Sequence, residues 1–231
     1  MSRRAKRGSA FVGESDRVPL ACAIVFAIVW AVVAIRPRYR DAWLLENLVT
    51  LVAVPAAVLT YRKYRISNVG YVLATIFLVL HTIGSYYTYS EVPLGDMARD
   101  WFGFSRNHYD RFVHFCFGLL MLRPLRELAI RRPAALGRAA TFFVGIALVA
   151  FGALAYEVVE WWVAVLSDPE AGQAFLGTQG DIWDSQWDMA LAWAGATVAA
   201  VIHLFRQGRT PPPHPVRVRR RLVRVWAVRR V

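Results

Sequence analysis

Residues 139–166 read AATFFVGIALVAFGALAYEVVEWWVAVL, and this run decides the fold class. It is long enough to cross the hydrocarbon core of a bilayer, about 30 Å thick, as one helix that rises about 1.5 Å per residue. It also carries two acids, Glu157 and Glu160, which are costly to place in a membrane and usually serve a function there. The run therefore predicts a transmembrane helix with a polar end.

Five more apolar blocks of similar length occur in the chain. The predicted spans are 18–35, 42–60, 68–88, 110–129, 139–166 and 186–205. Of the 231 residues, 57% are hydrophobic, whereas soluble domains are roughly 45–50% apolar. We therefore expect an all-α fold, a polytopic transmembrane helix bundle of about six spans, as one domain over residues 18–208. A basic N-tail (1–17) and a basic C-tail (209–231) flank this domain.

The Lys and Arg residues predict the orientation, because cytoplasmic loops carry an excess of them. With the N-terminus inside, 22 of the 28 lie in cytoplasmic segments, while 13 of the 16 Asp and Glu residues lie outside or near outer helix ends. We therefore expect both termini in the cytoplasm. Arg36, Arg38 and Arg40 conflict with this pattern, since they follow the first span on its outer side. If residues 18–35 were not a full span, only the N-terminus would change sides.

The formal net charge of +12 does not indicate nucleic-acid binding, because the basic residues flank apolar spans and are not interleaved with aromatics in a soluble patch. We expect the lipid bilayer as the partner, with anionic lipid at the basic cytoplasmic face. In the C-tail, arginines alternate with Val, Leu and Trp, so this segment either lies on an anionic membrane surface or remains a solvated tail. Cys22 and Cys116 stand inside apolar blocks and predict no disulfide framework.

Acids and histidines recur at the predicted outer ends of four to five spans, which places them at one depth in the membrane. Asp110 and His114 are four residues apart, so they share a helix face. Such a cluster cannot stay fully ionised in a low-dielectric site, because like charges raise each other's pKa. A divalent cation, bound protons, Arg111 or a cationic ligand must therefore compensate the charge.

One histidine with several carboxylates suits Zn, Mn, Fe or Mg better than a thiolate-seeking metal. The sequence thus predicts an outward-facing polar site with a divalent metal ion as its candidate cofactor. The candidate metal ligands are Asp110, His114, Asp184 and Asp188, the candidate catalytic residues are Glu157 and Glu160, and the candidate ligand-binding residues are His81, Tyr87, Tyr89, Arg111 and Gln186.

Each of these residue types also has a simpler interpretation. Asp110 and Asp181 can be interfacial loop residues, and His81 can be a core histidine bonded to a neighbouring helix. The Trp and Tyr residues also suit an interfacial aromatic belt. Glu157 and Glu160 are harder to explain without a function, since apolar helices seldom carry two acids. No compact metal-binding motif such as HExxH occurs in the sequence.

Four segments, in this order, carry a family resemblance. They are HTIGSYYTYSEVPLG (81–95), RNHYDRFVHF (106–115), EVVEW (157–161) and GTQGDIWDSQWDM (177–189). They resemble the YjdF-type bacterial inner-membrane proteins, a family of unknown function, over roughly residues 70–205. The resemblance implies the bacterial inner (cytoplasmic) membrane as the location.

A looser similarity connects the chain to VanZ-like membrane proteins. It rests on DRFVHF (110–115), on Glu157 in the next helix, and on Asp184 or Asp188 at the start of a later one. This similarity implies a cell-envelope setting and joint action of Asp110, His114, Glu157 and Asp188. It implies no particular reaction.

The sequence leaves three functions open. The first is a polar site that binds a divalent metal or a polar envelope or lipid ligand, with hydrolytic or transfer chemistry as one outcome. The second is a proton-coupled small-solute transporter, since acids and a histidine in a bundle suit proton relays, although the six spans show no repeated half. The third is a non-catalytic structural or partner-binding membrane protein whose polar residues join its helices. Enzymatic activity is therefore not decided by the sequence.

Overall fold

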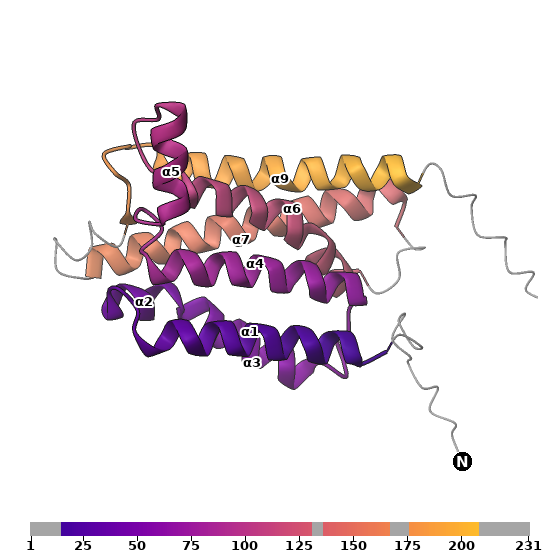
Figure 1. Ribbon diagram of the computed structural model, residues 1–231. Helices are drawn as coiled ribbons and strands as arrows, with labels where there is room; N and C mark the ends of the chain where they lie inside the picture. Colours follow the sequence, from indigo (N-terminus) through magenta and orange to yellow (C-terminus); the bar gives the residue numbers. More distant parts are fainter. Residues whose placement is uncertain (1–14, 131–135, 167–175, 208–231) are drawn as a thin grey trace, which may run out of the picture.

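The computed structural model describes residues 15–130, 136–166 and 176–207, and within them it is helical without strands (Figure 1). The helices are α1 (Arg17–Ile35), α2 (Arg40–Glu46), α3 (Leu48–Thr60), α4 (Asn68–Tyr86), α5 (Pro93–Phe102), α6 (Tyr109–Ala129), α7 (Arg138–Leu166) and α9 (Asp184–Gln207). The predicted all-α bundle is confirmed. The predicted C-tail, and most of the N-tail, lie outside the described residues.

Four described helices, α1, α4, α7 and α9, are long and apolar enough to cross a membrane, and the bent pair α2–α3 raises the number to five. Helix α6 corresponds to the predicted span 110–129 and runs along the bundle beside α7 and α9 (Figure 1). Helix α6 is not apolar enough to count among these spans, because charged residues stand at both of its ends. Their charges have partners inside the protein: Arg123 Nε lies 2.8 Å from Glu127 Oε1, and Glu127 accepts the backbone N–H of Ser67 at 2.7 Å.

The predicted span 42–60 is not one straight helix. It forms α2 and α3, which meet at Asn47 with a bend of 46°. The Asn47 side chain explains the break, because its Nδ2 donates to the carbonyl of Trp43 at 2.8 Å while its Oδ1 accepts from Trp30 Nε1 at 2.8 Å. An asparagine that bonds its own preceding turn and a neighbouring helix competes with a continuous backbone ladder.

Helices α6 and α9 pack with their backbones in contact. A Cβ added at Gly118 would lie 1.8 Å from the carbonyl oxygen of Ala192, and one added at Gly195 would lie 2.1 Å from that of Phe115. Small residues at such positions let membrane helices approach closely. Around this crossing lies the main apolar core, which joins α6, α7 and α9: Leu122, Phe142, Val149, Ala153, Ala192, Ala196, Ala199 and Ala200.

Helix α5 was not predicted, and it runs across the end of the bundle rather than along it (Figure 1). It begins with Pro93 at its first turn and ends at Gly103, whose φ of 67° is the left-handed conformation that glycine adopts easily. Its apolar side chains point away from the protein, and Trp101 is 73% exposed. This is the pattern of a helix that lies in the plane of a membrane interface.

The end of the bundle that carries α5 is here called the site end. Helices α4 and α7 finish there, while α6 and α9 begin there (Figure 1). Helix α1 begins at the opposite end, and helix α9 ends there. The two described termini of the bundle therefore lie on the same side (Figure 1). At that opposite end, Asp16 accepts the hydroxyl of Tyr61 at 2.6 Å and pairs with Arg65 at 2.5 Å.

Candidate metal and ligand site

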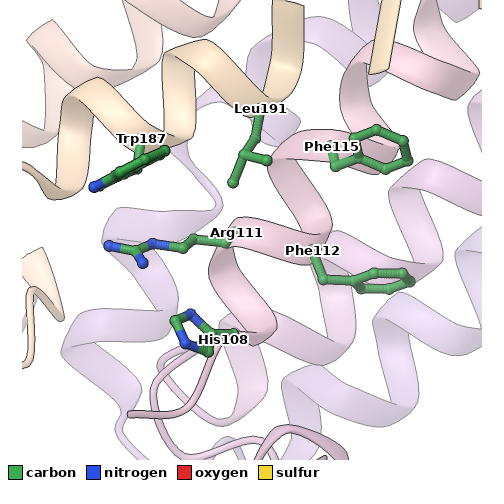
Figure 2. Close-up of a pocket in the computed structure, with 6 residues that line it drawn as sticks. All are labelled: His108, Arg111, Phe112, Phe115, Trp187 and Leu191. Atoms are coloured by element: carbon green, nitrogen blue, oxygen red, sulfur yellow. The ribbon is translucent and has the colours of Figure 1, made fainter. Parts of the chain in front are cut away.

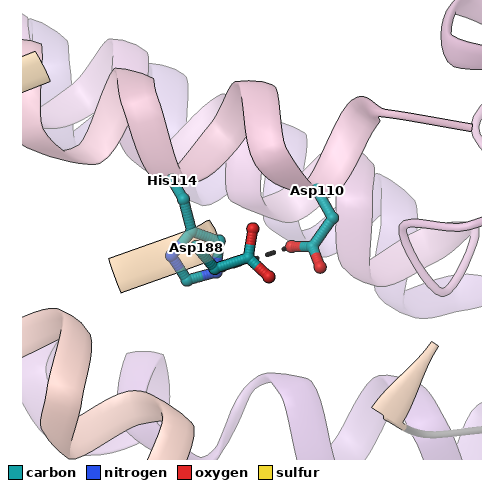
Figure 3. A group of neighbouring side chains, drawn as sticks. All are labelled: Asp110, His114 and Asp188. Carbon is teal, nitrogen blue, oxygen red and sulfur yellow. Dashed lines mark ion pairs between the residues drawn. The ribbon is translucent and has the colours of Figure 1, made fainter. Parts of the chain in front are cut away.

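Three of the predicted metal ligands meet inside the bundle at the site end. Asp110 and His114 lie one turn apart on α6, and Asp188 reaches them from the first turns of α9 (Figure 3). One ligand atom from each of the three lies within 4.8 Å of the other two. This group is called the acid–histidine cluster below. The close contact at Gly118 and Ala192 fixes its width, because those residues follow His114 and Asp188 by one turn each.

A third acid, Glu157, borders the acid–histidine cluster from α7. Nε2 of His114 lies 3.5 Å from Oδ1 of Asp110 and 3.5 Å from Oε1 of Glu157. Glu157 is only 6% exposed and Asp188 only 2%. In the part of the chain that the structure describes, Oε1 of Glu157 and Oδ1 of Asp188 have no hydrogen-bond partner. Buried polar atoms are seldom left without a partner, so these two oxygens need an explanation.

Asp184 does not join the acid–histidine cluster, because two arginines hold it. Nη1 of Arg106 lies 2.5 Å from Oδ1 of Asp184, and Nη2 of Arg111 lies 3.3 Å from the same oxygen. Arg111 also pairs with Asp181 at 2.5 Å. These four residues form an arginine–aspartate network with two positive and two negative charges. It joins the start of α6 and the loop before it to the start of α9 and the loop before that helix.

Two groups near this network have displaced pKa values. The backbone N–H of Trp183 donates to Asp181, and together with Arg111 this lowers the pKa of the Asp181 carboxyl, so it is ionised. Burial, followed by the charges of Arg111 and Arg106, lowers the pKa of His108. His108 is therefore the neutral imidazole at neutral pH.

A second polar group lies beside the acid–histidine cluster and joins α2, α4 and α7. Tyr156 donates its hydroxyl to the buried Glu46 at 2.6 Å, and Nδ1 of His81 hydrogen-bonds the hydroxyl of Tyr89. The ring of Tyr156 lies between the two histidines, with its centroid 6.5 Å from His81 and 6.2 Å from His114. Tyr89 has a φ of 54°, which is rare for a bulky residue and turns its side chain back onto His81.

Of the three remaining predicted site residues, Glu160 hydrogen-bonds Glu157, and the other two lie outside these contacts. Glu160 follows Glu157 by one turn on α7 and is half-buried. Tyr87 packs its ring edge against Tyr86, with centroids 4.6 Å apart. Gln186 is exposed on the far side of α9 from Asp184 and Asp188.

Three important residues were not selected from the sequence. Arg106 lies between two predicted spans, where a basic residue is ordinary. Glu46 stands alone in its predicted span, so no pair of acids indicated a site there. Tyr156 lies in an apolar run where aromatic residues are ordinary, and only the fold brings it to Glu46.

A multi-helix membrane bundle with acids and a histidine buried at one end of its spans is the class of protein that these observations define. The chain belongs to the family described as "Predicted membrane protein (DUF2238)", which matches residues 18–209. It is 35% identical over 185 residues to the inner membrane protein YjdF of Escherichia coli (strain K12), a match that covers 80% of this chain and 87% of that protein. No solved structure matches the chain.

These comparisons confirm the predicted YjdF-type resemblance and the membrane class, whose function is unknown. The similarity to VanZ-like proteins, the cytoplasmic position of both termini and the affinity for anionic lipid stay predictions.

Proposed function

We propose that this protein binds one divalent metal ion in the membrane, with Asp110, His114 and Asp188 as ligands. The observation that carries the proposal is the convergence of three ligand atoms within 4.8 Å of one another, in a buried position on two helices whose backbones touch. A mixed nitrogen and oxygen donor set suits Zn, Mn or Fe(II).

The distances favour an ion over direct hydrogen bonds. The two 3.5 Å separations at His114 Nε2 are longer than the range of about 2.7–3.2 Å typical of N–H···O bonds. Two ligands that each bind a tetrahedral ion at about 2.1 Å lie about 3.4 Å apart. Asp110 and His114 are therefore spaced as two ligands of one ion would be, and an ion would give Asp188 Oδ1 its missing partner.

The charge balance also supports an ion. Three carboxylates, from Asp110, Glu157 and Asp188, surround a single histidine in a poorly solvated place. The nearby arginines are already paired with Asp181 and Asp184. A divalent cation compensates this charge without requiring each acid to take up a proton.

Glu157 lies across the acid–histidine cluster from α6 and is placed to take a proton from a bound water molecule. Glu160, one turn further along α7, is then the next acid in line for that proton. This is the arrangement that hydrolytic or transfer chemistry needs.

Metal analysis of the purified protein tests the proposal. After incubation with Zn, Mn or Fe(II) and removal of free ions, we expect about one ion per chain by inductively coupled plasma mass spectrometry. His114→Ala and Asp188→Asn should each lose the ion, since each removes one of three ligands. His203→Ala is the matched control, because His203 lies on α9 near Phe142 and far from the cluster, at the opposite end of that helix. Equal metal content in wild type and both ligand variants would refute the proposal.

A further inference from the structure

A groove runs along the outer side of the α6–α9 pair, on the opposite face of α6 from the acid–histidine cluster. One wall is formed by three residues of α6 and the N-cap residue that precedes it, which follow helical spacing, and two residues of α9 form the other wall (Figure 2). The groove has a volume of about 450 Å³. Its lining residues are His108, Arg111, Phe112, Phe115, Trp187 and Leu191.

The groove is apolar along most of its length and basic at one end. Phe112 and Phe115 project to the same side, while the guanidinium of Arg111 lies towards Trp187 (Figure 2), with its central carbon 5.7 Å from the ring centroid. Phe112 and Trp187 are exposed, so the apolar part of the groove is open on the outside of the bundle. A hydrocarbon chain can therefore enter from the side.

A polar hollow of about 350 Å³ continues the groove at its basic end. It shares His108 and Arg111 with the groove and adds Arg106 and Asp181 among its lining residues. The two together form a continuous surface, polar at the membrane boundary and apolar inside the membrane. This shape fits an amphiphile whose head group reaches the arginines.

The arginines identify the charge of that head group. Arg106 is 6% exposed, and its Nε, like that of Arg111, is a buried donor without a hydrogen-bond partner among the described residues. Their remaining N–H groups contact Asp184, Asp181 and the carbonyl of Thr178. Two guanidinium donors thus lack a partner beside a hollow that both arginines line, and a phosphate supplies several oxygens in the geometry that arginine binds best.

The acids of the network are compatible with an anionic ligand. Asp184 is deeply buried and balances Arg106, whereas Asp181 stands at the rim of the hollow and is the more exposed of the two. A phosphate that approaches Arg111 competes with Asp181 for the guanidinium group. His108 can donate one hydrogen bond as the neutral imidazole.

We propose that this groove binds a membrane phospholipid, with the phosphate at Arg111, Arg106 and His108 and one acyl chain along Phe112, Phe115 and Leu191. The site is separate from the acid–histidine cluster and does not require the metal ion. It adds a lipid ligand on the outer side of the helix that carries Asp110 and His114.

Native mass spectrometry of the full chain, delipidated in detergent, tests this. The probes are phosphatidylglycerol, diacylglycerol, which lacks the phosphate, and glycerol phosphate, which lacks the chains. We expect phosphatidylglycerol to bind at least about tenfold more tightly than either of the others, because each lacks one half of the recognised surface. Equal binding of diacylglycerol would refute the phosphate site, and equal binding of glycerol phosphate would refute the acyl groove.

Two variants test the phosphate end and the acyl groove separately. The double variant Arg111→Gln/Asp181→Asn removes one phosphate donor and keeps the charge balance, and Leu191→Trp fills the acyl groove. Each should weaken phosphatidylglycerol binding about tenfold. Val198→Trp is the control, since Val198 is exposed on α9 two turns beyond the groove. Unchanged binding in both groove variants, with folding intact by circular dichroism, would overturn the proposal.

The lipid proposal and the metal proposal can be tested independently of each other. His114→Ala should lose the ion and keep the lipid, whereas Leu191→Trp should keep the ion and lose the lipid. If lipid fails to bind while the metal remains stoichiometric, only the groove assignment falls. If metal is absent while the lipid variants behave as described, only the metal assignment falls.

Discussion

Gly118 of α6 and Ala192 of α9 are in backbone contact, and a Cβ at Gly118 would lie 1.8 Å from the carbonyl oxygen of Ala192. The obstacle is backbone, which cannot rotate away as a side chain can. One turn towards the site end, the same two helices present His114 and Asp188 to each other. The separation of the helices at Gly118 thus sets the separation of the ligands.

Gly118→Val should therefore push α6 and α9 apart and widen the acid–histidine cluster. We expect overpacking to cost about 1–3 kcal/mol of stability and metal content to fall with it, measured by thermal denaturation and elemental analysis. Gly137→Ala is the control, because a Cβ there meets nothing within 4 Å. Full metal content in Gly118→Val would show that the cluster does not depend on this contact.

Asp184 and Asp188 lie one turn apart but should respond in opposite ways to substitution by Asn. Asp184→Asn breaks a buried ion pair and leaves Arg106 undercompensated, which costs about 3–5 kcal/mol, so thermal stability should drop while the metal stays. Asp188→Asn removes a buried carboxylate whose Oδ1 has no hydrogen-bond partner among the described residues. It should lose the metal with little loss of stability in the metal-free protein. The reverse pattern would contradict the assignment of the two acids.

Phospholipid binding should strengthen as the pH falls. Burial and the charges of Arg111 and Arg106 lower the pKa of His108, while Asp184 acts in the opposite direction. A bound phosphate would add negative charge and raise that pKa, so the imidazole takes up a proton on binding. Affinity therefore increases as the pH drops through the raised pKa of the complex.

His108→Gln should remove this pH dependence while keeping binding at neutral pH. Titration of phosphatidylglycerol binding between about pH 5 and 8, the range in which histidines change charge, measures it. The same pH slope in wild type and His108→Gln would assign the dependence to another group.

Asn107→Ala should release α5 from the bundle. The Asn107 side chain is 1% exposed and donates to the carbonyl of Val92 and to Asp96, at 3.0 and 3.1 Å, while accepting the backbone N–H of Tyr109. Loss of these bonds leaves buried groups unsatisfied at about 1–3 kcal/mol each. Limited proteolysis between α5 and α6 should accelerate several-fold, with Asp100→Ala, at an exposed position on α5, as the control.

Hydrophobic length and charge position suffice to predict the bundle, because both are local properties of the sequence. The depth of Asp110, Glu157 and Asp188 follows from the same spans, so their shared end of the bundle can be predicted as well. Their mutual distances cannot, because they depend on how α6 crosses α9 at Gly118. That contact leaves no signal in a single sequence beyond one glycine among many.

Two local features, the bend at Asn47 and helix α5, cannot be predicted from the apolar spans for a different reason. The bend at Asn47 arises from bonds to Trp30 and Trp43, one of them on another helix. Helix α5 is only ten residues long and has mixed polarity, so a search for spanning runs passes over it. The role of Arg106 cannot be predicted from the spans either, because it depends on the contact between the loop before α6 and the start of α9.

The arginine–aspartate network has a consequence for how the protein is made. Arg106 and Arg111 precede Asp181 and Asp184 by some seventy residues, so the ribosome delivers the positive half of the network before the negative half. Until residues 181–184 emerge, a nascent chain carries these two arginines without either counter-charge. The short segment 181–188 supplies both counter-charges and also Asp188, so charge balance and a complete acid–histidine cluster arrive together in synthesis. A chain truncated before residue 181 therefore keeps both arginines and lacks both of the acids that balance them.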